Sequence, residues 1–190
     1  EAASRDTYVM AHAYTDEAVR RCLRAGVRSI EHANFVTEET VALMGEHRAF
    51  FDPTFISLVQ RVESAGETGL STTIVHNVSH AIEQGRTVYG WARKHGVPIA
   101  LGTDLWGPDA RRSQLRELEL RSELDESRNV VRSATAVNAE LLQMAGQLGT
   151  IRQGAFADLL VVGGDPLRDA RVLCHPEQNL LLVMKDGVIY

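Results

Sequence analysis

Three residues that could bind a metal ion stand at or near the ends of short apolar segments. His12 follows residues 8–11, His32 lies near the end of residues 27–33, and Asp104 follows residues 97–101 and a Gly-Thr pair. Two neutral imidazoles and a carboxylate are ligands that zinc, manganese or iron accepts, and three protein ligands with one open position are typical of hydrolytic metal sites. Each residue taken alone could also be a structural histidine or a turn aspartate. Their recurrence at equivalent places along the chain strengthens the metal-binding interpretation, and both interpretations stay open from the residues alone.

Tyr14 is a candidate substrate-binding residue because it stands two positions after His12. Residues at i and i+2 of a strand point to the same face, so the phenol could donate a hydrogen bond to a substrate oxygen, and a packed aromatic ring fits the pattern equally well.

His76 and His80 are four residues apart but lack the Glu of an HExxH site, and we interpret them as surface residues. Neither a Gly-rich phosphate loop nor a nucleophile elbow occurs, which argues against kinases and serine hydrolases.

Alternating strand and helix patterns position the three candidate ligands. Strands are predicted over residues 8–13, 27–33, 49–55 and 97–101, and helices over the segments capped by Thr15 and Thr37, over 74–94, and near 114–124 and 129–145. The residues from Phe55 to about Ser71 are predicted to form a longer surface loop. Strand-then-helix units of about 20 residues predict parallel strands with crossover helices, whose functional side chains gather at the carboxyl edge of the sheet.

The composition changes near residue 149. Residues 159–162 and 180–185 are apolar, and Asp186-Gly187 is a typical hairpin turn before residues 188–190. We therefore expect an α/β part over residues 1–148 and a small β subdomain over residues 149–190.

The overall composition limits the possible partners. The 190 residues are 44% hydrophobic and 24% charged, with a net charge of −5, which is typical of a soluble globular protein. This weakly acidic balance argues against nucleic-acid binding, and no apolar run approaches the roughly 20 residues that span a bilayer. Cys22 and Cys174 lie far apart in the sequence, which favours reduced thiols in a cytoplasmic protein. The chain has no secretory signal and no initiator Met, so we expect it to begin within a longer protein.

Five short blocks, taken together and in order, resemble the amidohydrolase superfamily. They are Ala11-His12-Ala13, Ser29-Ile30-Glu31-His32-Ala33, Asp52-Pro53-Thr54, Gly102-Thr103-Asp104, and a terminal block running from Gly149 through Ile151, Gly154, Ala157 and Asp158 to Leu159. Within the superfamily the chain is most similar to the imidazolonepropionase-like branch, which contains Xaa-Pro dipeptidases (prolidases). The resemblance covers essentially all 190 residues.

The resemblance implies an α/β fold, namely the C-terminal half of a (β/α)8 TIM-like metal-dependent hydrolase barrel plus C-terminal strands of a small β-sandwich subdomain. Residues 1–148 would supply barrel strands five to eight, and residues 149–190 a segment of the composite β-sandwich. His12, His32 and Asp104 would end the fifth, sixth and eighth strands as metal ligands, with Asp52-Pro53-Thr54 on the seventh. Asp104 would also be the catalytic proton shuttle, and Tyr14 would hold the substrate α-carboxylate.

The resemblance further implies a metal-dependent amidohydrolase that cleaves an amide or peptide C–N bond with metal-activated water, in particular a dipeptidase for substrates with proline or another amino acid on the C-terminal side. The expected cofactor is a divalent metal, zinc, as one or two ions. The expected partners are a small peptide or amide substrate, with no nucleic acid and no membrane, and the full-length form is expected to be a homo-oligomer.

Two alternatives remain open at the level of sequence. One is a cyclic amide hydrolase like imidazolonepropionase, although residues 105–108 lack the Asn-Pro-Gly expected there. The other is a catalytically incomplete half-barrel that only associates with a complementary chain, because the HxH pair of the first barrel strand is absent from the sequence and four of eight strands are recognisable.

Overall fold

The computed structural model describes residues 1–107 and 110–190, which form two compact units. The first unit comprises residues 1–107, and the second comprises the described residues from 110 to 190. Each unit has its own sheet, and the two sheets differ in strand direction.

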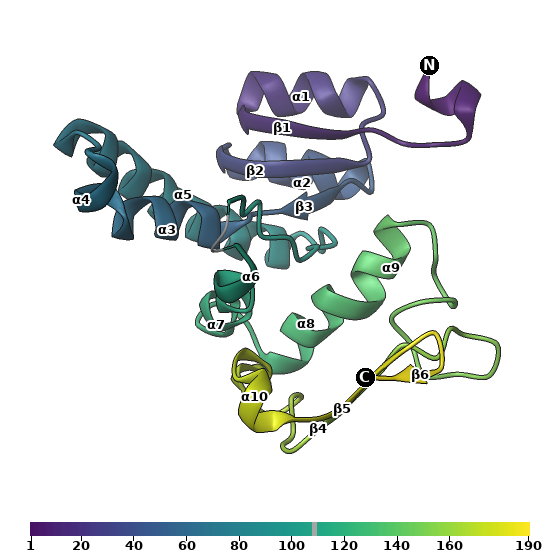
Figure 1. Cartoon of the computed structure of the whole chain (residues 1–190). Helices are drawn as coiled ribbons and strands as arrows, with labels where there is room; N and C mark the ends of the chain where they lie inside the picture. The colour runs from purple at the N-terminus through teal and green to yellow at the C-terminus, as the bar shows by residue number, and fades with distance from the viewer. Residues whose placement is uncertain (108–109) are drawn as a thin grey trace. The chain divides into compact units, whose positions relative to one another are not determined.

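A parallel sheet forms the centre of the first unit. Its strands β1 (Met10–Thr15), β2 (Ser29–Phe35) and β3 (Phe50–Asp52) lie side by side in chain order. Helices α1 (Asp16–Arg24) and α2 (Glu38–Glu46) follow β1 and β2 (Figure 1). The predicted strand at 97–101 contributes only one isolated parallel bridge, between Phe51 and Ile99, and β3 is shorter than the predicted 49–55.

Local sequence explains why α1 forms where it does. Asp16 and Glu17 occupy its first turn, where negative charge suits the helix dipole. Val19 and Leu23, four residues apart, are its buried side chains. Gly26 then adopts a φ of 75°, a left-handed conformation that glycine tolerates at a helix end. The helix predicted after Thr15 and its stop at Gly26 are therefore confirmed.

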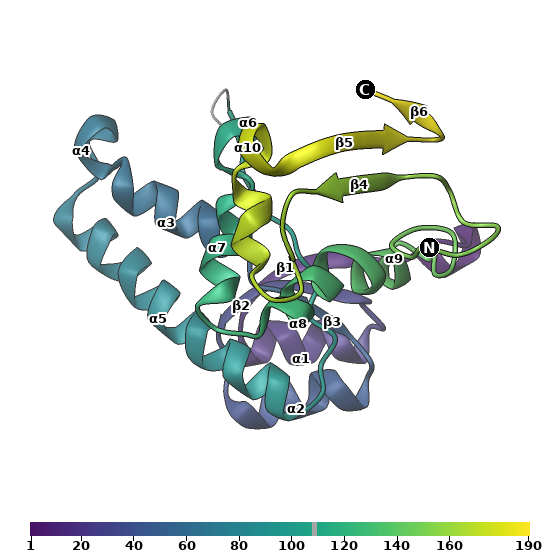
Figure 2. The same cartoon turned by 90° about the horizontal axis from the view of Figure 1, so that it is seen from below.

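The predicted loop after Phe55 is wrong, because the chain forms two further helices there. These are α3 (Phe55–Glu63) and α4 (Ala65–Thr68), followed by the long α5 (Thr72–Lys94), and α3 and α5 run side by side (Figures 1 and 2). Phe55 is buried, and its ring centre lies 6.2 Å from that of Tyr89 on α5. Packing between the two helices thus stabilises a segment that has weak local helix signals.

Short helices and an antiparallel sheet make up the second unit. Its helices include α6 (Ala110–Ser113), α7 (Arg116–Ser122), α8 (Ser127–Arg132), a π-helical turn (Ser133–Val137), α9 (Asn138–Leu141) and α10 (Pro176–Asn179). Strand β5 (Leu180–Lys185) pairs with both β4 (Leu159–Val162) and β6 (Val188–Ile189). The hairpin predicted at Asp186-Gly187 is confirmed. The division predicted between residues 148 and 149 stays a prediction.

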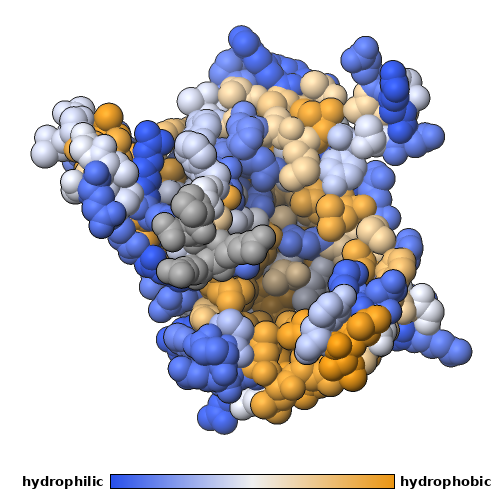
Figure 3. Space-filling model, viewed as in Figure 1, coloured by the Kyte–Doolittle hydropathy of each residue, from blue (hydrophilic) through white to orange (hydrophobic). Residues whose placement is uncertain are grey.

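Apolar side chains remain exposed on the sheet of the second unit. Leu160, Leu181 and Ile189 are among its exposed large hydrophobic residues, and the part of the surface formed by β4 and β5 is coloured as apolar in Figure 3. Cys22 and Cys174 are both free thiols, as predicted. In residues 1–107 and 110–190, no helix combines the length and the hydropathy that crossing a membrane requires.

Candidate functional site

His12 and His32 face each other at the carboxyl end of the parallel sheet. His12 Nδ1 lies 2.7 Å from His32 Nε2, and the two rings stack with centres 5.0 Å apart. The strand register explains this arrangement, because Ala13 of β1 pairs with His32 of β2. His32 therefore lies between the side chains that flank Ala13, which are those of His12 and Tyr14.

Asp104 joins the two histidines from a third segment of the chain. Its Oδ2 lies 4.0 Å from His32 Nε2, and its side chain is about half exposed. The structure thus brings together all three residues that the sequence singled out as metal ligands. His32 Nε2 lies nearest to both partners, His12 Nδ1 and Asp104 Oδ2.

Thr54 fixes the orientation of the His32 ring. Its Oγ1 is hydrogen-bonded to His32 Nδ1 at 2.8 Å, and both side chains are buried. With Nδ1 engaged, Nε2 is the ring atom that remains directed toward His12 and Asp104. A partner on the second ring nitrogen is the usual way in which a ligating histidine is oriented. The sequence placed Thr54 in a motif but did not predict this role.

Burial keeps His32 in its neutral form. Removal from water lowers the pKa of its imidazole below the ordinary value, the Asp104 carboxylate opposes this effect, and His12 adds to it. The neutral imidazole is the form that binds a metal ion.

The Tyr14 ring also packs against the His32 ring. The two rings stack with centres 4.7 Å apart and planes 12° apart, and Tyr14 is 42% exposed. Burial raises the pKa of its hydroxyl above the ordinary value, Asp104 raises it further, and Arg61 opposes the rise. The phenol is therefore protonated at neutral pH, and its role in substrate binding stays a prediction.

Two buried carboxylates lie beside this cluster. Ser29 Oγ donates to Glu31 Oε1 at 2.6 Å, and the pKa of Glu31 rises to about 7, chiefly through burial, with smaller increases from Asp52 and Asp104 against the opposing Ser29 bond. Asp52 Oδ1 accepts the Gly102 backbone N–H at 3.1 Å. A Cβ at position 102 would overlap the Asp52 carboxylate, so glycine is required for the chain to pass this close to β3 on its way to Asp104.

The backbone is strained where these side chains are held. His32, Ala33, Thr54 and Asp104 have φ values of 75°, 47°, 45° and 50°. Such left-handed conformations cost non-glycine residues about 1–3 kcal/mol each and persist only where the surrounding structure enforces them. These four residues lie near the ends of β2 and β3 and at Asp104, while other left-handed residues, such as Arg48 and Gln143, lie away from the cluster.

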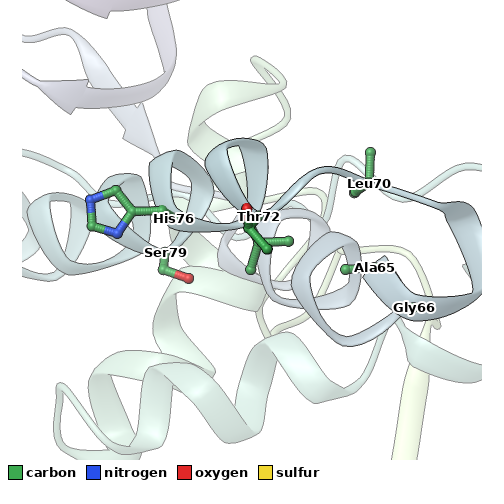
Figure 4. Close-up of a pocket in the computed structure, with 7 residues that line it drawn as sticks. Ala65, Gly66, Leu70, Thr72, His76 and Ser79 are labelled. Carbon is green, nitrogen blue, oxygen red and sulfur yellow. The ribbon is translucent and has the colours of Figure 1, made fainter.

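The donor types fit a divalent metal, although the ligand set is small. Within residues 1–107 and 110–190, no group of three or more His, Cys, Asp and Glu side chains is arranged so that it could hold a metal ion. The donor types of His12, His32 and Asp104, two imidazoles and a carboxylate, are nevertheless those of a common zinc set. A separate hollow between α4 and α5, beside His76 and Ser79, contains none of these residues (Figure 4).

Comparison with known proteins gives matches along the whole chain. The Amidohydrolase family matches residues 1–190. Ochratoxinase from Aspergillus niger is 30% identical over 198 residues, covering 100% of this chain and 39% of the relative. An uncharacterized protein of Mycobacterium tuberculosis is 28% identical over 173 residues, covering 91% of this chain and 46% of the relative.

Solved structures give the same result. The crystal structure of a prolidase complexed with N-methylphosphonate-L-proline matches with a TM-score of 0.92 and 38% identity, and a Xaa-Pro dipeptidase with bound methionine matches with a TM-score of 0.83 and 30% identity. Both matches cover 100% of this chain and 46% of the solved chain.

The chain thus spans about half the length of the relatives it matches. The predicted fold class is confirmed, since the parallel β/α unit and the antiparallel strands together correspond to a partial amidohydrolase barrel with additional strands. The full-length family match and the shared fold show that this chain belongs to the amidohydrolase family.

Proposed function

We propose that this chain carries part of the active site of a metal-dependent dipeptidase, which hydrolyses the amide C–N bond of a short peptide with proline or another amino acid on its C-terminal side. The observation that carries the proposal is that His32 Nε2 on β2 lies close to both His12 Nδ1 on β1 and Asp104 Oδ2 on the segment after residue 101. The prolidase and Xaa-Pro dipeptidase relatives support the substrate class, and amidohydrolases generally depend on a metal.

In this proposal His12, His32 and Asp104 hold a divalent ion, which we expect to be zinc. The chemistry that such an ion supplies is Lewis acidity, which polarises an amide carbonyl and makes water a nucleophile near neutral pH. Thr54 holds His32 in the neutral, ligating orientation. The protein thereby keeps the donor atoms aligned before substrate arrives.

Asp104 moves the proton in the proposed reaction. Its half-exposed carboxylate can accept a proton from the attacking water at an oxygen atom and pass it to the leaving nitrogen. The Tyr14 hydroxyl donates a hydrogen bond to the carboxylate of the substrate, which fixes the direction in which the peptide lies.

Metal binding tests the ligand assignment without relying on activity. Zinc is titrated into the metal-free chain and followed by calorimetry, for the wild type and for His32→Ala, Asp104→Asn and Thr54→Val. We expect His32→Ala to abolish binding and Thr54→Val to weaken it about 10- to 100-fold, because it removes the partner of His32 Nδ1.

His76→Ala is the matched control, since His76 is an exposed histidine on α5, and it should bind zinc like the wild type. Equal zinc affinity in the wild type and His32→Ala would contradict the ligand assignment.

Hydrolysis is then measured with Xaa-Pro dipeptides in the longest natural polypeptide that contains residues 1–190. Asp104→Asn is expected to lower kcat at least about 100-fold, the size typical of a lost general acid–base group. Tyr14→Phe is expected to raise KM more than it lowers kcat. Wild-type rates in Asp104→Asn would exclude the proposed proton transfer.

A further inference from the structure

A second aromatic pair lies at the same sheet edge as the proposed metal ligands. Phe35 is the last residue of β2, three positions after His32, and its ring stacks on His80 of α5 with centres 6.0 Å apart and planes 29° apart. Phe35 is 41% exposed although it is a large apolar residue. An apolar ring presented to solvent beside a reactive cluster is a feature that a binding site uses.

Buried contacts between β2 and α5 hold this pair in place. Asn34 Nδ2 donates to the Ala81 carbonyl at 3.0 Å, and the Asn34 side chain is fully buried. Asn34 precedes Phe35 and Ala81 follows His80, so one hydrogen bond connects the immediate neighbours of both rings. Gly85, one turn further along α5, allows the close approach, because a Cβ there would lie 2.8 Å from Asn34 Nδ2.

The strand register places Phe35 within reach of a small substrate. Phe35 pairs with Thr15, the residue after Tyr14, while the Tyr14 ring stacks on His32. Three residues of extended chain measure at most about 10 Å, so the Cα atoms of Phe35 and His32 are no further apart than a dipeptide is long. Tyr14 and Phe35 are exposed aromatic residues at the last two positions of β1 and β2.

We propose that Phe35, backed by His80, forms the subsite for a bulky apolar or aromatic side chain on the N-terminal residue of the peptide. This inference rests on the proposed function, in which Tyr14 binds the carboxylate of the C-terminal residue. The remaining variable group of a dipeptide is the N-terminal side chain, and the face of an exposed ring favours another ring or a large aliphatic group. Asn34 is a positioning residue for this subsite.

The first test compares substrates that differ only in the N-terminal side chain. For Phe35→Ala we expect kcat/KM for Phe-Pro to fall about tenfold, while the value for Ala-Pro changes less than twofold, since a pocket contact with an apolar group typically changes discrimination about 10- to 200-fold. His80→Phe should retain the preference for Phe-Pro because it keeps the stack. Ile74→Ala, which removes an exposed apolar residue elsewhere on α5, should leave both rates unchanged.

A binding measurement separates failure of the subsite from failure of the proposed function. L-phenylalaninamide and L-alaninamide are titrated into the whole chain, and the NMR signals of Phe35 and His80 are followed. Selective shifts with L-phenylalaninamide would support the subsite even if the wild type hydrolyses no dipeptide. Equal loss of both rates in Phe35→Ala, or shifts confined to other residues, would overturn the subsite while leaving the hydrolase proposal intact.

Discussion

The sheet with the more apolar strands is the more exposed of the two. In β2 of the first unit every residue from Ser29 to Asn34 is buried, including His32. In β5 of the second unit no residue is buried, and Leu181 is 68% exposed. A parallel strand with helices on its crossovers is enclosed by its own unit, whereas an antiparallel sheet can expose a face. Burial in this chain therefore depends on the layers around a strand and not on its apolar content.

The largest effect is expected from a truncation in the buried sheet. Phe51 of β3 is fully buried, so Phe51→Ala should cost about 3–5 kcal/mol of the free energy of unfolding. Leu181→Ala, the matched change in the exposed sheet, should stay within about 0.5 kcal/mol. Urea denaturation, monitored by amide hydrogen exchange in each unit, measures the loss of unfolding free energy in both variants. Comparable losses for the two variants would show that β5 is as enclosed as β3.

Replacing one glycine by alanine in each unit should change the free energy of unfolding in opposite directions. Gly187, in the hairpin turn, has a φ of 78°, so Gly187→Ala should destabilise the second unit by about 1–2 kcal/mol. Gly90 lies inside α5 with open space around it, so Gly90→Ala should stabilise the first unit by up to about 1 kcal/mol. Thermal unfolding of both variants is the measurement. A stabilising Gly187→Ala would mean that the turn is not formed in solution.

The smallest effect concerns one aspartate in each unit. The pKa of Asp16 is lowered because hydrogen bonds from Thr37 and Thr40 and the charge of Arg20 outweigh its burial, and the pKa of Asp158 is lowered by hydrogen bonds from Lys185 and the Asp186 backbone. A lowered folded-state pKa stabilises above the unfolded-state pKa, and the stabilisation is lost as pH falls through the folded value.

Asp16→Asn and Asp158→Asn should therefore each flatten the acid limb of the stability curve below about pH 4, with Asp16 contributing less than about 1 kcal/mol after solvent screening. Added salt should diminish the Asp158 effect more, because its Lys185 partner is exposed. Unfolding curves between pH 3 and 7 test this. A stability gain in the wild type on acidification would contradict the sign.

Local patterns were sufficient to predict three parallel strands and the residues that lie close together near their ends, although not the bounds of each strand. His12, His32 and Asp104 follow apolar segments whose parallel pairing brings their side chains together. The hairpin at Asp186-Gly187 was predictable for a similar reason, since its turn chemistry is contained in two adjacent residues.

Features that depend on distant contacts were not predictable. Helix α3 is stabilised by packing on α5, where Phe55 contacts Tyr89, 34 positions further along the chain, and the sequence of α3 alone predicts a loop. The Thr54 bond to His32 and the Phe35 stack on His80 join residues 22 and 45 positions apart. To predict the buried ion pair between Glu117 and Arg121 on α7, one must also know which face of the helix is covered.

The left-handed backbone at the strand ends creates a trade-off under selection. His32, Ala33, Thr54 and Asp104 adopt conformations that glycine or asparagine would accept at lower cost. A screen for thermal stability alone should therefore enrich glycine or asparagine at these positions, and three of the four changes would remove a proposed ligand or the group that orients it. Directed evolution of a more stable variant would thus first replace the residues of the proposed metal site, unless catalytic turnover is selected at the same time.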